Sequence, residues 1–390
     1  MTSVSCDVAI VGGGPVGAAL AILLARQGLR IVIVEGRELQ PHEPQAWDSR
    51  VFAISPGSRA LLRVLGVWQR IATERVAAIA GMRVWGDDDE STIGFDALEV
   101  GSEDLGAIVE AGRLQMALWD AMRAEPEIDL RCPIRCGALR LNDGGGALTL
   151  SDGAEIQTAL LVGADGAESW LRGAAGLTAT AKPYAQTAVV ANFATERAHG
   201  NVARQWFRGD GVLAWLPLPG DRISIVWSAE NAVAEELLAL TSTARCERGA
   251  EAGGGALGRF ELLGSPASFP LRMVSVPRAV GQCVALVGDA AHVVHPLAGQ
   301  GINVGFRDVV ALSEALRGRG RHEGAGDLVV LRRYERSRRE DWLATRIVTD
   351  GLQRLFHADR RDVAIVRNLG LALAERLPEL KRRLMAQAMQ

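Results

Sequence analysis

Apolar runs separated by glycine-rich turns organise the first 35 positions of the chain. Residues 6–11 are almost continuously apolar and rich in β-branched side chains, a pattern typical of a buried parallel strand. Residues 18–27 follow a helical pattern that ends at Gly28, and residues 30–34 predict a second strand. The order of strand, helix and strand predicts a βαβ unit at the start of the chain.

Two later segments repeat the pattern of an apolar strand that ends in glycine and an acid. Residues 159–166 end in the letters GADG, and residues 283–289 end in GD. A glycine-rich loop follows the second segment at 296–305. Each segment predicts a place where backbone N–H groups can approach a bound anion.

The remaining patterns are coarser. Residues 222–227 alternate between polar and apolar side chains, which predicts a strand of an antiparallel sheet. Residues 240–258 are rich in glycine and alanine and predict a loose connection. From Leu328 onward the pattern is helical.

The composition is that of a globular protein of two to three domains. Hydrophobic residues make up 48% of the 390 positions, charged residues 23%, and the formal net charge is −3. This balance excludes intrinsic disorder and a dedicated nucleic-acid binder. The longest apolar stretch, residues 16–25, is shorter than the roughly 20 residues of a membrane-spanning helix. With no signal peptide and 5 cysteines in no metal-type spacing, the sequence predicts a cytoplasmic protein with reduced thiols.

Arginine is the unusual residue of this composition. Only Lys182 and Lys381 among the 43 basic residues are lysines, which leaves 41 arginines. A genomic bias toward arginine codons explains most of them, whereas some can hold phosphate or carboxylate groups through paired hydrogen bonds. Five arginines cluster between residues 332 and 339, for which two interpretations are open: a solvated helix face or a contact with anionic lipid.

The turn after the first predicted strand carries a G-x-G-x-x-G motif in its full structural context. Gly12 permits the tight turn, Gly14 lets the backbone approach a pyrophosphate, and Gly17 lets helix and strand pack closely. Glu35 stands at the end of the second strand, where a carboxylate can accept hydrogen bonds from both ribose hydroxyls and repels a 2′-phosphate. The site therefore suits FAD or NAD.

The three glycine motifs, in this order and spacing, resemble those of the FAD-dependent aromatic hydroxylases, the group A flavoprotein monooxygenases of the para-hydroxybenzoate hydroxylase fold. The resemblance covers nearly the whole chain and is strongest to the ubiquinone-biosynthesis hydroxylases, through residues 48–55, 207–218 and 350–371. The chain departs from that branch at Gly112, where asparagine is usual, and at Val212, where proline is usual. The resemblance implies an α/β fold with a Rossmann-like FAD-binding domain, an interleaved antiparallel-sheet substrate domain and C-terminal helices.

The same resemblance divides the chain into three parts. It assigns residues 1–75, 111–180 and 273–320 to the FAD-binding domain, residues 76–110 and 181–272 to the substrate domain, and residues 321–390 to a C-terminal helical region.

The resemblance also implies how FAD is held. Asp289 bonds the ribityl chain, Glu35 the adenosine ribose, and Arg50 and Arg113 the pyrophosphate or the flavin edge. The complete predicted set is Gly12, Gly14, Pro15, Val16, Gly17, Glu35, Arg50, Arg113, Asp165, Gly166, Asp289, Pro296, Gly299, Gln300, Gly301, Ile302 and Asn303. We predict no catalytic side chain, because the flavin carries the chemistry. We also predict no metal site, because His292 and His295 have no third ligand nearby.

The implied reaction hydroxylates the aromatic ring of a prenylated phenol in ubiquinone biosynthesis. NAD(P)H reduces FAD, O2 adds at the flavin C4a, and the resulting hydroperoxide gives one oxygen to the ring. The family also implies peripheral contact with the inner membrane or with a quinone-synthesis complex. The choice between NADH and NADPH and the oligomeric state both stay open. Three alternatives remain: a hydroxylase of a small soluble aromatic, an isoprenoid reductase or epoxidase, and a non-catalytic flavoprotein subunit of a quinone-synthesis complex.

Overall fold

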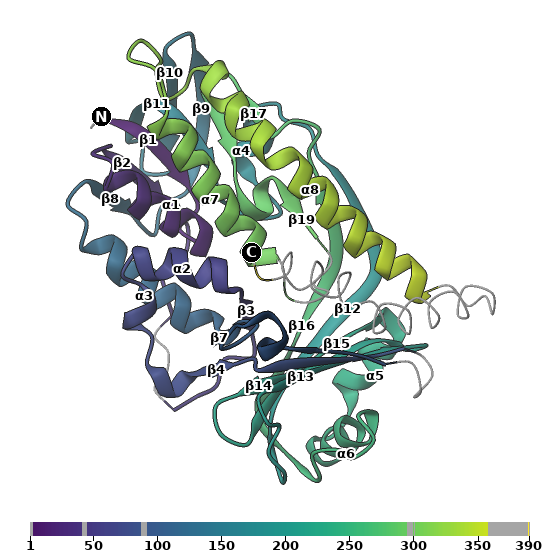
Figure 1. Cartoon of the computed structure of the whole chain (residues 1–390). Coiled ribbons are helices and arrows are strands. Elements are labelled where there is room, and N and C mark those ends of the chain that lie inside the picture. The colour runs from purple at the N-terminus through teal and green to yellow at the C-terminus, as the bar shows by residue number, and fades with distance from the viewer. Residues whose placement is uncertain are drawn as a thin grey trace.

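Two large sheets, one small sheet and eight α-helices make up the part of the chain that the computed structural model describes (Figure 1). The description covers residues 3–40, 45–86, 92–294, 299, 301–357 and 389, without the side chains of 348–350 and 352–357. The predicted residues Pro296 and Gln300, and most of the predicted C-terminal region, lie outside it. The predicted α/β class, with a Rossmann-like unit and a second sheet, is confirmed; the domain boundaries stay a prediction.

The first sheet is mainly parallel, and the apolar runs form its centre. Its main path is β17-β18-β11-β1-β2-β8, and β10 and β9 continue it from β11 in antiparallel order. Its strands are β1 (Ser3–Val11), β2 (Ile31–Val34), β8 (Ile128–Arg131), β9 (Cys136–Asn142), β10 (Gly145–Leu150), β11 (Glu155–Gly163), β17 (Val280–Gly281) and β18 (Val284–Leu286). The second half of β1 and all of β2 are buried on both faces, so residues 8–11 and 31–34 are apolar throughout rather than alternating.

Helices cover one face of this sheet. Leucines, isoleucines and alanines of α1, α3 and α7 pack against the side chains of Val8, Ile10, Ile31 and Ile33, all at most 1% exposed. The helices of this half of the molecule, on either face, are α1 (Pro15–Ala25), α2 (Pro56–Val64), α3 (Ala111–Arg123), α4 (Trp170–Ala174), α7 (Gly301–Arg317) and α8 (Leu328–His357). The opposite face packs against β9, β10 and α4.

The second large sheet has the order β19-β16-β12-β15-β14-β13-β5-β6. It is antiparallel except for the pair β13 and β5, which runs parallel. Its strands are β5 (Gly81–Trp85), β6 (Thr92–Asp96), β12 (Thr180–Thr195), β13 (Val202–Arg208), β14 (Gly211–Leu218), β15 (Arg222–Glu230), β16 (Phe260–Ser275) and β19 (His292–Val293). The long strands β12 and β16 run between the two large sheets and join them (Figure 1).

A small sheet and two helices complete this half of the molecule. The small sheet has the order β3-β7-β4, with β3 (Val51–Ile54), β7 (Ala107–Glu110) and β4 (Val76–Ala78). The helices α5 (Asn231–Ala239) and α6 (Ser242–Ala252) cover one face of the second sheet, where Phe193, Trp215 and Trp227 are at most 3% exposed. The other face of that sheet turns toward the first sheet.

The expectation of a loose connection over residues 240–258 is wrong. Residues Ser242–Ala252 form α6, whose first turn is capped by the Thr241 hydroxyl, which accepts a hydrogen bond from the Ala244 N–H. A segment rich in glycine and alanine is flexible only when its side chains do not pack against other residues. Here Ala252 packs into the hydrophobic core against the second sheet, so the segment is ordered as a helix. Gly249 lies buried within the helix, and the other glycines follow it from its C-cap, Gly253, onward.

Helix α8 is not the uniformly solvated or lipid-facing surface that its arginine cluster suggested. Arg338 is 6% exposed and Arg333 pairs with Glu323 at 2.6 Å, whereas Arg332, Arg336 and Arg339 are exposed. Both interpretations of the cluster therefore fail for Arg338, which points into the protein. Close to it, the Tyr334 hydroxyl donates a hydrogen bond of 2.8 Å to the Leu286 carbonyl at the end of β18.

We predict that Tyr334→Phe loosens the attachment of α8 to the first sheet. The phenol is fully buried, so its loss leaves the Leu286 carbonyl without this partner and lowers the free energy of unfolding by about 1–2 kcal/mol. Chemical denaturation of the purified protein measures the change. An unaltered denaturation midpoint would contradict a structural role for this bond.

Candidate functional site

The three glycine motifs meet at one edge of the parallel sheet. The strands β2, β1, β11 and β18 are neighbours in that order, and each motif follows the carboxyl end of its strand. Two backbone hydrogen bonds tie the motifs together: the Ala164 N–H donates to the Val11 carbonyl at 2.8 Å, and the Val287 N–H donates to the Gly163 carbonyl at 2.9 Å. In open α/β sheets, ligands bind at this edge.

The first motif leaves an open space in front of Gly14 and none around its other two glycines. A Cβ atom at Gly17 would lie 2.0 Å from the Gly12 carbonyl oxygen, and one at Gly12 would lie 2.4 Å from the Ala164 carbonyl oxygen. A Cβ atom at Gly14 would meet no atom within 4 Å. Gly12 and Gly17 therefore serve the packing of the turn, and the backbone at Gly14 faces the cavity.

Side chains far apart in the sequence hold this turn in place. The Glu35 carboxylate accepts hydrogen bonds from the N–H groups of Gly13 at 2.7 Å and Arg37 at 2.9 Å. Gln115 and Trp119, one turn apart on α3, both donate to the Gly13 carbonyl at 2.7 Å. The turn is thus fixed from both sides.

The second motif is built around a helix cap and an arginine. The Asp165 carboxylate accepts hydrogen bonds from the Ser169 hydroxyl and from the Leu171 N–H at the start of α4. Arg172 donates to the carbonyls of Ala167 at 2.8 Å and Ala290 at 2.9 Å. Arg172 therefore connects the second motif to the third, so the two loops keep a fixed relation.

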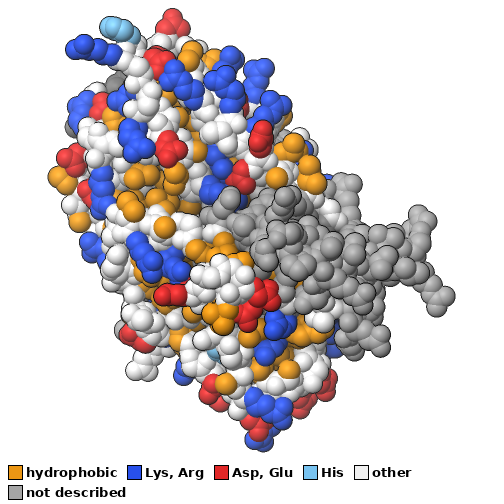
Figure 2. All heavy atoms as spheres, viewed as in Figure 1, with side chains coloured by type: hydrophobic (Ala, Val, Ile, Leu, Met, Phe, Trp, Pro, Cys, Tyr) orange, Lys and Arg blue, Asp and Glu red, His pale blue; other side chains and the backbone are white. Residues whose placement is uncertain are grey.

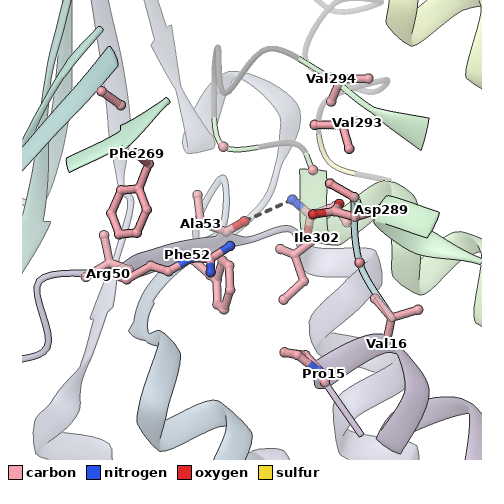
Figure 3. Close-up of a pocket in the computed structure, with 18 of the residues that line it drawn as sticks. Pro15, Val16, Arg50, Phe52, Ala53, Phe269, Asp289, Val293, Val294 and Ile302 are labelled. Carbon is pink, nitrogen blue, oxygen red and sulfur yellow. Dashed lines mark hydrogen bonds between the residues drawn. The ribbon is translucent and has the colours of Figure 1, made fainter. Parts of the chain in front are cut away.

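Asp289 of the third motif projects into the cavity beside Ile302 and Val16 (Figure 3). Surrounding protein raises the pKa of its carboxyl above the ordinary value, and the positive charges of His292, Arg50 and Arg272 oppose that rise only in part. Because the side chain is exposed to the cavity, water offsets much of the cost of this charge in the empty protein. It is a good acceptor for hydroxyl groups of a ligand.

A buried carboxylate lies directly behind the third motif. Asp308 of α7 is 0% exposed and accepts four hydrogen bonds: from the Gly288 N–H at 3.0 Å, His292 Nε2 at 2.6 Å, Arg338 Nε at 2.8 Å and Trp342 Nε1 at 2.9 Å. Burial alone raises the pKa of this carboxyl, but the imidazole and the guanidinium outweigh burial and hold it below its ordinary value. One ionised side chain thus connects the loop, α7 and α8.

The start of α7 closes the cofactor side of the cavity. Asn303 is 1% exposed, and its amide accepts from the Ser55 N–H at 3.0 Å and donates to the Ala53 carbonyl at 2.9 Å, the dashed line in Figure 3. The side chain of Asn303 thus ties the first turn of α7 to β3. The N–H groups of this turn have no helical partners and carry the positive end of the helix dipole.

Arg50 bridges the two halves of the site. Its Cζ lies 5.3 Å from the centre of the Phe52 ring on β3 and 5.7 Å from the centre of the Phe269 ring on β16 (Figure 3). Cation–π contacts of this kind contribute about 0.5–1 kcal/mol each at exposed sites. The guanidinium marks the point where the cofactor side meets the second sheet.

A single continuous cavity of about 1430 Å³ extends from the glycine motifs to the open face of the second sheet. This volume exceeds the roughly 300–1,000 Å³ of an ordinary small-molecule site, so it can take a dinucleotide and a second ligand together. Among the described residues, no group of three metal-ligating side chains occurs.

Most of the predicted site residues line this cavity. They are Gly12, Gly14, Pro15, Val16, Glu35, Arg50, Asp165, Gly166, Asp289, Gly299, Gly301, Ile302 and Asn303. Gly17 lies behind them in the packed turn, and Arg113 donates to the Glu110 carboxylate at 2.8 Å outside the lining. The assignment of each residue to FAD stays a prediction.

The comparisons with known proteins agree with this geometry. The sequence model of the FAD binding domain matches residues 5–348. A ubiquinone hydroxylase of Rhodospirillum rubrum is 37% identical over 98% of this chain and 89% of its own length. The 3-demethoxyubiquinol 3-hydroxylase of Escherichia coli is 36% identical over the full length of both proteins. The chain belongs to the FAD-dependent aromatic hydroxylases, in the ubiquinone-biosynthesis branch.

Solved structures of other flavin monooxygenases share the fold of this hydroxylase. PqsL of Pseudomonas aeruginosa, crystallised with 2-aminobenzoylacetate, superposes with a TM-score of 0.76 at 25% identity and covers 93% of this chain and 100% of its own. The p-nitrophenol 4-monooxygenase of Pseudomonas putida superposes with a TM-score of 0.78 at 18% identity, over 100% and 99% of the two chains.

The residues of the hydroxylase fit its cofactor, FAD. The open space at Gly14 suits a pyrophosphate, the Glu35 carboxylate stands at the end of β2 where a ribose is held, and Asp289 supplies an acceptor for a polyol chain. The first turn of α7 presents unpaired N–H groups toward the same cavity. All four features line one continuous wall.

Sequence reasoning missed the residues that support this wall from behind. Gln115 and Trp119 stand four residues apart on a helix, which places them on one face, but nothing in the sequence pairs them with Gly13. The bonds from Arg172 to Ala290 and from Arg338 to Asp308 have no local signal in the sequence, because the partners are 118 and 30 residues apart.

We predict that Gly14→Ala and Gly17→Ala separate cofactor binding from folding. Gly14 has φ −63° and free space for a methyl group, so Gly14→Ala folds normally but weakens FAD binding by obstructing the pyrophosphate. Gly17→Ala clashes with the Gly12 carbonyl and destabilises the apoprotein itself. Thermal unfolding of both apoproteins, together with FAD titration, measures the difference; equal effects of both changes on apoprotein stability would refute this division of roles.

We predict that Asp289→Asn stabilises the apoprotein while it weakens FAD binding. Because the folded-state pKa of Asp289 is raised, folding must hold a disfavoured charge at neutral pH, and asparagine removes that cost. The gain is full above the raised folded-state pKa, fades as the pH falls below it, and is lost below the ordinary value of 3.8, where the carboxyl is protonated in both states. Denaturation curves across this pH range measure it; a gain that persists at pH 3 would contradict the electrostatic origin.

Proposed function

We propose that this hydroxylase adds a hydroxyl group to the aromatic ring of a prenylated phenol in ubiquinone biosynthesis, with NAD(P)H as reductant and O2 as oxidant. The observation that carries the proposal is the cavity, which continues from the cofactor motifs onto an apolar sheet face. The names of the bacterial relatives, a ubiquinone hydroxylase and a 3-demethoxyubiquinol 3-hydroxylase, support the choice of pathway.

The sheet face suits a substrate that is mostly hydrocarbon. Along β13, β14 and β15, every second side chain faces the cavity, among them Phe207, Val212, Leu216 and Val226. Burying an isoprenoid chain on such a surface contributes about 25 cal/mol for each Å² removed from water. A small soluble aromatic would leave much of this surface without contact.

The chain supplies enclosure and orientation rather than an acid or base. When bound, FAD takes electrons from NAD(P)H and activates O2, so that one oxygen atom enters the ring and the other leaves as water. The apolar sheet face keeps bulk water from the reacting atoms, which limits wasteful release of H2O2. We propose that the first turn of α7 stabilises negative charge on the ring system through its N–H groups, and that Asp289 and Glu35 hold the two sugar-like parts of the cofactor.

We also propose that α8 gives the hydroxylase peripheral contact with a membrane. Leu343 and Ile347 are 46% and 60% exposed on the outer side of α8, and Arg336 and Arg339 are exposed near them. In the view of Figure 2, basic side chains are interspersed with acidic ones over the surface. No helix among the described residues combines the length and hydropathy that a membrane span requires.

The decisive test supplies the purified, FAD-loaded protein with ¹⁸O2, NADH or NADPH, and 2-geranylphenol as the probe. We expect a product that carries one ¹⁸O atom on the ring, with more NAD(P)H consumed than H2O2 released. Mass spectrometry and a peroxide assay give both quantities. The Asp289→Ala variant, which we expect to purify without colour, is the control for flavin dependence.

Each other outcome selects a different function. A reduced or epoxidised prenyl chain identifies the isoprenoid chemistry. Rapid hydroxylation of tail-less phenols with little turnover of 2-geranylphenol identifies a hydroxylase of small aromatics. Normal ubiquinone synthesis in cells that carry only the colourless Asp289→Ala variant identifies a non-catalytic subunit.

A further inference from the structure

The cavity-facing side of the second sheet contains two neutral polar side chains in an apolar surrounding. Gln205 of β13 lies opposite Val84 of β5 and Ala214 of β14. Ser228 of β15 lies opposite Val212 of β14 and Ala188 of β12. All six side chains line the cavity.

Both polar side chains are buried and turned toward the cavity. Gln205 is 7% exposed and Ser228 is 4% exposed. Within the described part of the chain, neither the Gln205 amide nor the Ser228 hydroxyl forms a side-chain hydrogen bond to another residue, and their polar atoms keep contact with the cavity. Because these polar atoms face the cavity, water can satisfy them in the empty protein, and a ligand that displaces this water binds better when it supplies hydrogen-bond partners of its own.

The third polar residue on this part of the wall is already engaged. Arg204 belongs to the alternate positions of β13, and its guanidinium donates to the carbonyls of His199 at 3.3 Å and Val202 at 3.4 Å. Burial and the nearby Arg83 lower the pKa of Arg204. Gln205 and Ser228 are the uncharged polar residues of this part of the wall, and their side chains suit hydroxyl or ether oxygens.

The register of the sheet places the pair at a distance that fits one substituted ring. Gln205 and Ser228 are two strands and two residues apart, which corresponds to roughly 12 Å between their Cα atoms. This gap takes a six-membered ring with oxygen substituents on opposite sides and a hydrogen bond of about 2.9 Å at each end. Ser228 is the nearer of the two to the cofactor side. It lies opposite Ala188 of β12, which lies opposite Phe269 of β16, and the Phe269 ring contacts Arg50.

We propose that Gln205 and Ser228 hydrogen-bond the ring oxygens of the substrate, and that this pair favours an oxygenated ring and fixes which ring edge faces the flavin. The inference rests on the proposed function, because it deepens the description of the same cavity. The apolar neighbours of the pair hold the ring faces and the hydrocarbon chain, and the pair alone sets the orientation.

The test compares how the FAD-loaded protein binds 2-geranylphenol and geranylbenzene, which differ only in the ring oxygen. Perturbation of the flavin absorbance reports binding of both without turnover. We expect the wild-type protein to bind the phenol roughly tenfold more tightly than geranylbenzene, and one of Gln205→Met and Ser228→Ala, whichever removes the partner of the single phenol oxygen, to lose most of that preference. Both variants also release more H2O2 for each NAD(P)H consumed, because the ring is no longer held in place.

Ser224→Ala is the matched control. Ser224 lies on the same strand as Ser228, is 0% exposed and does not line the cavity, so its loss leaves the preference for the phenol intact. FAD content and thermal unfolding confirm that each variant is folded, and Ser228→Ala, which removes a single oxygen atom, keeps the test decisive if Gln205→Met does not fold.

Two results overturn the inference: a wild-type protein that binds both compounds equally, or variants that both keep the wild-type preference. Failure of the proposed function has a different signature. In that case 2-geranylphenol binds with the expected preference but no oxygenated product forms from it.

Discussion

The buried carboxylate of Asp308 is the constraint on which the site depends. An ionised group without access to water must find hydrogen-bond donors within the protein. The donors to Asp308 are the Gly288 N–H of the third motif, the His292 imidazole of β19, and the side chains of Arg338 and Trp342 on α8. Removing a single partner leaves a buried charge undercompensated, so the loop, α7 and α8 hold one another in place. The loop that presents Asp289 to the cavity is therefore set by a helix more than 45 residues further along the chain.

The cavity combines two surfaces with opposite chemistry. The edge of the parallel sheet offers backbone N–H groups, carboxylates and Arg50, which suit a charged dinucleotide, while the second sheet offers mostly apolar side chains with Gln205, Ser228, Arg204 and Arg272 among them. The strands β12 and β16 belong to the second sheet and run up to the first, so they fix the distance between the two surfaces. An oxygen-dependent reaction on a hydrophobic phenol needs both surfaces in one enclosure.

The sequence predicted the parts of the site that are local. Gly12, Gly14, Glu35 and Asp289 follow strands directly, and a strand followed by a glycine turn has few ways to fold. The tethers Asp308 and Arg338 join positions 30 residues apart through side chains that look like ordinary surface charges in the sequence. Sequence reasoning also mistook residues 240–258 for a loose connection, because the apolar side chains that cover α6 come from β-strands elsewhere in the chain.

The flavin content of the purified protein tests the central claim most directly. Heat releases a non-covalently held flavin, and mass spectrometry identifies it and gives its amount per chain. We predict FAD at one molecule per chain, because the open backbone at Gly14, the Glu35 carboxylate and the Asp289 carboxylate line one cavity large enough for a dinucleotide. Release of FMN, or no bound flavin after incubation with excess FAD, would contradict it.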